Sequence, residues 1–167
     1  MKFNYYAFRA MYLHEMDRFK RTLMQSLFSP VLSTSLYFIV FGSVIGGYVE
    51  KIDGISYGSF IVPGLLMLTL LTQSISNTSF GIFFPKFNGT MYEILAAPIS
   101  TFEIVLAFVG AGATKTLLVG VVIFLTATFF VEVQVMYPLL MIFLLVLVAF
   151  TFALFGFLIG LMSSNFE

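Results

Sequence analysis

The sequence predicts an all-α polytopic membrane protein with four transmembrane helices, and three observations support this prediction. Of the 167 residues, 60% are hydrophobic and only 10% are charged, whereas soluble domains carry about 25% charged residues. The charges leave four long uncharged intervals: 22–49, 54–85, 116–131 and 133–166. These intervals lack the alternating polarity of membrane β-barrel strands. About 20 apolar residues cross a bilayer as a helix. Each interval therefore holds one span, and the third is long enough once the residues before it are included.

The spans are expected at about residues 25–48, 58–82, 104–131 and 138–162. The third must begin before Lys115, because only 16 uncharged positions follow that lysine. A lysine at the centre of a span costs about 2.5–3.5 kcal/mol on insertion scales, and less where its stem reaches the interface. We therefore expect Lys115 in the inner half of the third span.

Residues 3–21 predict an amphipathic helix in the membrane interface. Apolar side chains recur there at steps of three and four, which is typical of one helix face: Tyr5, Phe8, Tyr12, Met16, Phe19 and Leu23. The other side carries Arg9, Arg18 and an Asp17–Arg21 pair at i, i+4. A basic face opposite an aromatic face favours a helix lying in the interface. The alternative is a solvated leader that packs on nothing.

The positive charges predict a cytoplasmic N-terminus. Five of the eight Lys and Arg lie within residues 1–21 and Lys86 lies in the loop after the second span, while 49–57 has one and 132–137 has none. Lys and Arg are in excess on the cytoplasmic side of a membrane protein. Three tyrosines then fall at the outer interface, where aromatic side chains gather: Tyr48, Tyr57 and Tyr137.

The loop between the second and third spans has the features of a short, well-capped soluble helix. Thr90 with Glu93, and Ser100 with Glu103, each have the S/T-x-x-E spacing of a capping box. Pro98 lies between the two boxes and ends the first helix. Because so short a helix is not stable alone in water, it must dock on the chain itself, on a cytoplasmic partner protein, or on both through different faces.

Three segments make the chain resemble the permease subunits of ABC-2-type exporters, and most closely the bacterial inner-membrane transport permeases. YGSFIVPGLL (57–66) opens the second span, KFNGTMYEILAAPIS (86–100) follows it, and GAGATKTLLVG (110–120) lies in the third. The Y-x-x-F-x-x-P-G element consists of Tyr57, Phe60, Pro63 and Gly64. The likeness covers the whole chain, but family members have about six spans. Residues 1–167 are therefore expected to be the N-terminal, four-span part of one transmembrane domain, truncated at its C-terminus.

The resemblance implies a transport function with two kinds of protein partner. A permease of this family pairs as a homodimer and docks on separate ATP-binding cassette subunits. The helix at about 90–98 is then the coupling helix that receives the ATPase stroke, and Lys115 falls on the family's basic position in the third span. The residues implied in coupling are Gly89, Thr90, Tyr92, Glu93, Leu95 and Pro98. The family exports lipids, glycans or drug-like molecules across the bacterial inner membrane.

The residues themselves disfavour several other functions. No G-x-x-x-x-G-K-[ST] phosphate loop occurs. We therefore expect that a partner subunit uses ATP and that this chain binds no cofactor. A net charge of zero gives no indication of a nucleic-acid partner. An intramembrane protease is disfavoured because His14 is the only histidine and no aspartate lies in a span. A passive channel or a membrane scaffold remains the alternative.

Two further patterns concern the interior of the spans. The segment TLLTQSISNTS (69–79) is unusually polar, so its side chains face protein or water rather than lipid. They either form interhelical hydrogen bonds or line a substrate path. The candidates for the path are Thr69, Gln73, Ser76 and Asn77. The GxxxG pair Gly156 and Gly160 favours close helix packing.

Overall fold

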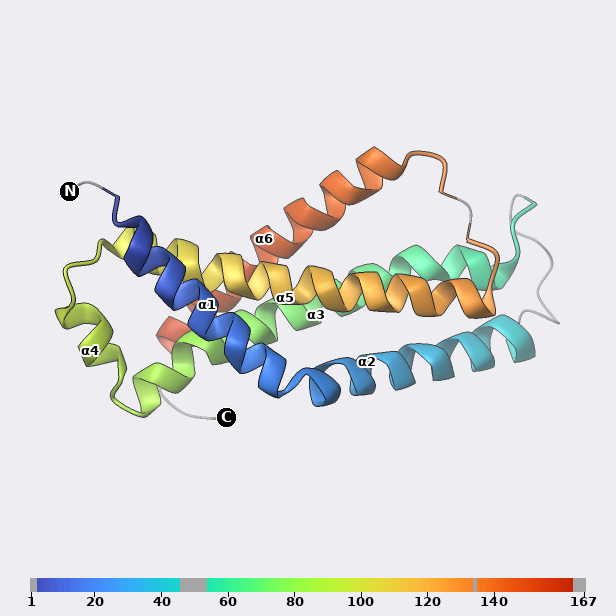
Figure 1. Ribbon diagram of the computed structural model, residues 1–167. Coiled ribbons are helices and arrows are strands. Elements are labelled where there is room, and N and C mark those ends of the chain that lie inside the picture. Colours follow the sequence, from blue (N-terminus) through green and yellow to red (C-terminus); the bar gives the residue numbers. More distant parts are fainter. Residues whose placement is uncertain (1–2, 46–53, 134, 164–167) are drawn as a thin grey trace.

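The computed structural model describes residues 3–45, 54–133 and 135–163, and every regular element within these ranges is a helix (Figure 1). In chain order they are α1 (Tyr5–Arg21), α2 (Leu23–Tyr37), a π-helical continuation η1 (Phe38–Ile45), α3 (Tyr57–Phe87), α4 (Met91–Ala96), α5 (Thr101–Phe130) and α6 (Pro138–Met162). Four of the described helices are long and apolar enough to cross a membrane: Leu23–Phe41, α3, α5 and α6. The predicted all-α, four-span fold class is confirmed.

The described helix ends lie within about five residues of the predicted span ends. The fourth span was expected over 138–162, and α6 has these bounds. The end of the first, 46–48, lies outside the described residues. The second continues five residues beyond 82, because Pro85 is accommodated within α3 and the helix ends only before Gly89, whose φ of +78° an L side chain rarely adopts.

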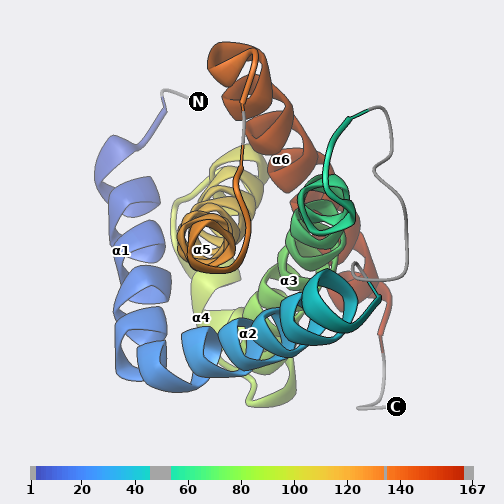
Figure 2. The same cartoon turned by 90° about the vertical axis from the view of Figure 1, so that its right-hand side faces the viewer.

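Helix α5 is the centre of the bundle. Its most apolar window is 56% buried within the chain, whereas the corresponding windows of the other three spans are 11–28% buried. Seen along the bundle, α5 lies between α1 and α3 (Figure 2). Small side chains such as Ala107, Ala111 and Ala127 are fully buried on it, which lets the neighbouring helices approach closely.

Close packing joins α6 to α3, as the GxxxG pattern predicted. A Cβ atom on Gly156 would lie 2.5 Å from the carbonyl oxygen of Ile75, and one on Gly160 would lie 2.7 Å from that of Ser79. The hydroxyl of Ser74 adds an interhelical hydrogen bond of 2.6 Å to the carbonyl of Ala149. The two glycines therefore pack within this chain.

Helix α1 packs against α5, which contradicts the alternative of a leader that packs on nothing. Phe19 is buried in a cluster with Val119 and Ile123 of α5. The predicted Asp17–Arg21 ion pair is wrong: Asp17 pairs instead with Lys20, three residues on, at 2.9 Å. Positions i+3 and i+4 share a helix face, so Lys20 competes with Arg21 for the carboxylate. Its hydrogen bond lowers the pKa of the Asp17 carboxyl.

Candidate functional site

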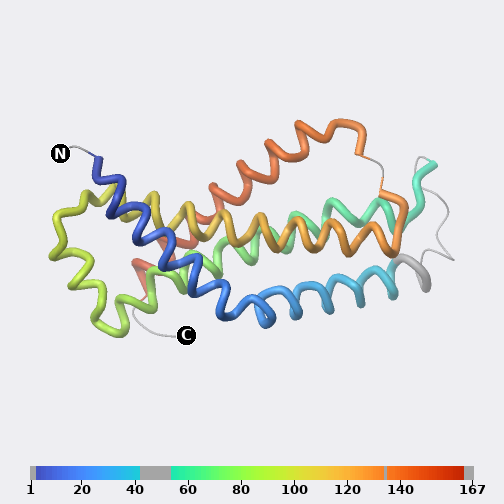
Figure 3. The backbone as a smooth tube through the Cα atoms, viewed as in Figure 1, coloured from blue at the N-terminus to red at the C-terminus, as the bar shows by residue number. Residues whose placement is uncertain are grey.

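The short helix α4 is docked on the chain by one face and exposed on the other. It lies at the same end of the bundle as the start of α1 and the end of α6 (Figure 3). Met91 and Ile94 pack against the core cluster formed by α3, α5 and α6. Glu93 is exposed, as are Tyr92 (78%) and Leu95 (63%). Docking on the chain itself is therefore observed. Of the six predicted coupling residues, Thr90 and Pro98 are exposed as well, and Gly89 is half-buried.

Only the second of the two predicted capping boxes is formed. At Ser100, the side-chain oxygen accepts a hydrogen bond from the backbone N–H of Glu103 (3.3 Å), and the Glu103 carboxylate accepts one from the N–H of Ser100 (2.8 Å). The predicted box at Thr90 is wrong, since Thr90 makes no side-chain cap bond. An N-cap needs an extended backbone; Ser100 has a ψ of 149°, whereas Thr90 has a helical ψ of −19°.

This difference gives a prediction for the two capping residues. Ser100→Ala is expected to destabilise the chain by about 0.5–2 kcal/mol, because the first turn of α5 loses its cap. Thr90→Ala is expected to be nearly neutral, because no hydrogen bond is lost. The thermal midpoint of each purified variant in detergent measures the effect. An equal loss of stability in both variants would show that the boxes are equivalent and would contradict the structure.

Polar contacts fasten α1 to α5 along its length. The carboxylate of Glu103 also accepts a hydrogen bond from the backbone N–H of Asn4, next to the start of α1. About two turns further along α1, the Tyr12 hydroxyl donates to the hydroxyl of Thr114 at 2.9 Å. The Glu103 carboxylate therefore caps α5 and also bonds to the residue that precedes α1. It lies four residues after Ile99, which packs on the core from the loop between α4 and α5.

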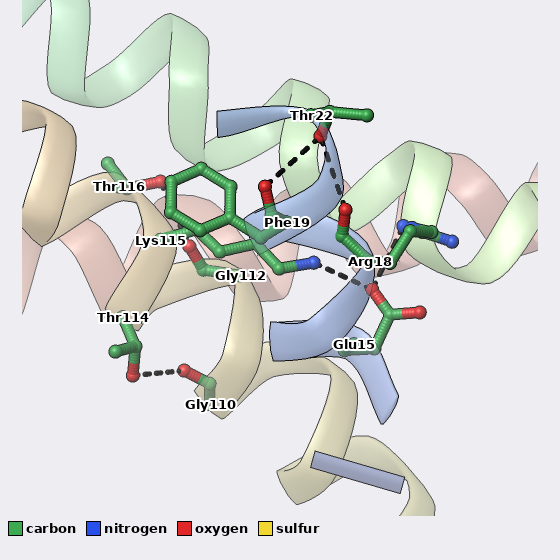
Figure 4. Close-up of polar contacts among 9 residues, drawn as sticks. All are labelled: Glu15, Arg18, Phe19, Thr22, Gly110, Gly112, Thr114, Lys115 and Thr116. Carbon is green, nitrogen blue, oxygen red and sulfur yellow. Dashed lines mark hydrogen bonds and ion pairs between the residues drawn. The ribbon is translucent and has the colours of Figure 1, made fainter. Parts of the chain in front are cut away.

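A buried ion pair lies further along the same interface (Figure 4). The ammonium Nζ of Lys115 lies 2.7 Å from Oε2 of Glu15, and both side chains are only 4% exposed. The guanidinium of Arg18 lies 2.9 Å from the same oxygen. Lys115 lies within α5, and its charge is neutralised by a carboxylate of α1. A buried charge is stable in a low-dielectric environment only when it is paired.

Helix α3 borders this cluster too. A Cβ atom on Gly81 would lie 3.5 Å from Oε2 of Glu15 and 3.7 Å from Nη2 of Arg18. Gly81 thus leaves room for the two charged side chains beside α3. The Glu15–Lys115–Arg18 cluster is therefore the point at which α1, α3 and α5 meet.

Glu15 was not among the predicted site residues, although the sequence carries a signal for it. Glu15 falls on the same helical stripe as Phe8, Tyr12 and Phe19, at spacings of three and four. A single carboxylate within an apolar stripe, in a chain with one lysine inside a span, indicates that the two charges pair.

The four predicted substrate-path residues lie along one side of α3, at spacings of three and four, and two of them line a groove. Thr69 and Gln73 line a groove of about 280 Å³ between α2 and α3. Ser76 is exposed outside this groove, and the side-chain amide of Asn77 lies 3.5 Å from that of Gln73. The hydroxyl of Thr69 donates to the Leu65 carbonyl of its own helix (2.8 Å), so it forms no interhelical bond.

The Y-x-x-F-x-x-P-G element lies at the opposite end of the bundle from α4. There α6 diverges from α3 and α5 (Figure 1), and a cavity of about 980 Å³ opens between the three helices. Tyr57, Phe60 and Pro63 line it. A Cβ atom on Gly64 would have nothing within 4 Å. The element therefore faces a cavity and open surface rather than the packed core.

Comparison with known proteins places the chain in a family. The family described as "ABC-2 type transporter" matches residues 6–167. The chain belongs to the ABC-2 type transporter family. This membership confirms the resemblance carried by the three motif segments. Together with the four long apolar helices, it makes this ABC-2 chain a multi-pass membrane protein.

Curated relatives of this ABC-2 chain are longer than it is. It is 37% identical over 161 residues to the protein named "Inner membrane transport permease YadH" of Escherichia coli (strain K12), and equally to the proteins of that name in Escherichia coli O157:H7 and Shigella flexneri. The match covers 96% of this chain and 63% of each relative. No solved structure matches the chain significantly.

Proposed function

We propose that the chain is the permease subunit of an ABC-type exporter in the bacterial inner membrane. It works as a homodimer and moves a lipid, glycan or drug-like substrate, using ATP hydrolysed by a separate ATP-binding cassette subunit. Membership of the ABC-2 family and the name of the relatives support this proposal. The alternative function, a passive channel or a scaffold, needs no such subunit.

The positions of the chain's features support an N-terminus in the cytoplasm. The basic helix α1 begins at the end of the bundle where α4 lies (Figure 3). Tyr57 and Tyr137 line the cavity at the other end, as expected of the aromatic side chains of an outer interface. In this orientation α4 projects into the cytoplasm.

The observation that carries the proposal is the exposed face of α4, formed by Tyr92, Glu93 and Leu95 on a helix that is fixed to the bundle from behind. An exposed aromatic and an exposed leucine beside a charge are typical of an interface core and its rim. Force applied here passes along residues 97–99 to the start of α5, where Ser100 and Glu103 form the cap. It reaches α1 through the hydrogen bond from Asn4 to Glu103.

Glu93→Lys is expected to weaken association with the ATP-binding cassette subunit by about tenfold or more, because reversing a charge at an interface sets like charges against each other. Co-purification of the two subunits from membranes measures this. Glu132→Lys is the matched control: the same reversal at an exposed glutamate beyond the C-terminal end of α5, at the other end of the bundle. Equal association of Glu93→Lys and the parent protein would refute docking through α4. Ion conductance without any ATP-binding subunit would favour the channel.

A further inference from the structure

The groove between α2 and α3 combines polarity with a complete lack of charge. It lies midway along α3 and along the second half of α2. Seven of its ten lining residues are polar: Ser29, Ser33, Thr34 and Tyr37 from α2, and Thr69, Thr72 and Gln73 from α3. The remaining three are Pro30, Leu65 and Leu68. A span surface that faced only acyl chains would not carry seven polar groups, since the hydrocarbon core satisfies none of them.

Several of these groups lack a hydrogen-bond partner within the described chain. Thr34 is only 4% exposed, yet its hydroxyl, like those of Ser29 and Ser33, makes no hydrogen bond with any described residue. The hydroxyls of Thr69 and Thr72 donate to carbonyls of α3, but their oxygen lone pairs can still accept. Ser29, Ser33 and Thr72 are exposed on the wall of the groove. Polar groups that face hydrocarbon without a partner are unfavourable, so the groove is suited to a ligand that both donates and accepts hydrogen bonds.

Charged ligands find no counter-charge there. The charged side chains within the described spans are Lys86, Glu103 and Lys115, and none lines the groove. Each is already engaged: Lys86 donates to the carbonyls of Leu161 and Ser163, Glu103 caps α5, and Lys115 pairs with Glu15. A phosphate or carboxylate in the groove would therefore lose its hydration without gaining a cation, which is strongly unfavourable.

We propose that the groove binds the uncharged, hydroxyl-bearing headgroup of an amphiphile and discriminates against anionic headgroups. Its volume of about 280 Å³ is just below the roughly 300–1,000 Å³ of sites that hold whole drug-sized ligands. It therefore accommodates a headgroup, with the acyl chains left in the lipid. The assignment of this amphiphile as cargo rests on the proposed export function, whereas the binding preference itself does not.

A competition between two lipids tests the proposal. The protein is purified in a detergent without a sugar headgroup and placed in nanodiscs with equal amounts of monoglucosyl diacylglycerol and phosphatidylglycerol of the same acyl chains. Native mass spectrometry then counts the lipids retained. We expect the glucolipid to be retained over phosphatidylglycerol by about fivefold, which one net hydrogen bond can supply. Thr34→Val and Gln73→Leu, each close in volume to the parent side chain, are expected to bring the ratio near one.

Two control variants separate the possible outcomes. Thr151→Val removes a hydroxyl of α6 that lies outside the groove and is bonded to the Leu147 carbonyl, and it must keep the preference. Glu93→Lys must keep it too, so failure of ATPase docking and failure of the groove are distinguishable. The proposal is overturned by equal or stronger retention of phosphatidylglycerol, or by a preference that survives both groove variants. Efficient cross-linking of Thr72→Cys between two copies also overturns it, because a second chain would then fill the groove.

Discussion

Glu15→Ala is expected to lower the thermal midpoint of the purified chain by roughly 10 °C. The substitution leaves the ammonium of Lys115 buried, without its carboxylate at 2.7 Å and next to the positive charge of Arg18. Removing one partner of a buried ion pair costs about 3–5 kcal/mol, and 1 kcal/mol corresponds to about 2–4 °C in a chain of this size. Heating the detergent-solubilised protein and following loss of the monodisperse species measures the shift.

Variants of the partner residue give this prediction its control. Lys115→Met is expected to cost clearly less than Glu15→Ala, because Glu15 keeps Arg18 at 2.9 Å. The double variant Glu15→Leu with Lys115→Met is expected to recover much of the stability, since apolar side chains often replace a buried pair without loss. If the two single variants lowered the thermal midpoint equally, and the double variant lowered it by their sum, the two charges would not interact.

Gly156→Ala is expected to lower the thermal midpoint by about 5 °C, and Gly64→Ala is expected to leave it unchanged or raise it slightly. At Gly156 the new Cβ would lie 2.5 Å from the carbonyl oxygen and 2.8 Å from the Cα of Ile75. These backbone atoms cannot rotate away, so α6 must move off α3, and such overpacking typically costs about 1–3 kcal/mol. The same thermal assay measures both variants.

At Gly64 a Cβ meets nothing within 4 Å, and alanine is favoured over glycine inside a helix by about 0.5–1 kcal/mol. The same chemical change therefore has opposite signs on α6 and α3. If Gly156→Ala were tolerated as well as Gly64→Ala, α6 would not pack on α3 in the observed register.

Features that depend on local sequence were predictable, and features that depend on distant contacts were not. The bounds of α6 and the existence of α4 follow from uncharged intervals, Pro98 and the cap at Ser100, all of which act within a few residues. The failed cap at Thr90 shows the limit of a spacing motif, because the backbone there is helical and cannot adopt the cap geometry.

The geometry of the ion pair and the shape of the groove could not be predicted in this way, for a physical reason. Glu15 and Lys115 are 100 residues apart, so their pairing depends on how α1 crosses α5. Similarly, Thr69 and Gln73 indicated a polar surface on α3. That Ser33 and Thr34 of α2 line the same groove follows only from the packing of the two spans.

A cytoplasmic position of α4 is the claim on which docking to an ATP-binding subunit depends. The chain has no cysteine, so single cysteines report location without background. Thr90→Cys places one beside α4, and Ile55→Cys places one at an exposed position before α3, at the opposite end of the bundle. With a membrane-impermeant maleimide, Ile55→Cys should be labelled in intact cells, and Thr90→Cys only after the membrane is opened. Labelling of Thr90→Cys in intact cells would place α4 outside and contradict its proposed role in docking an ATP-binding subunit.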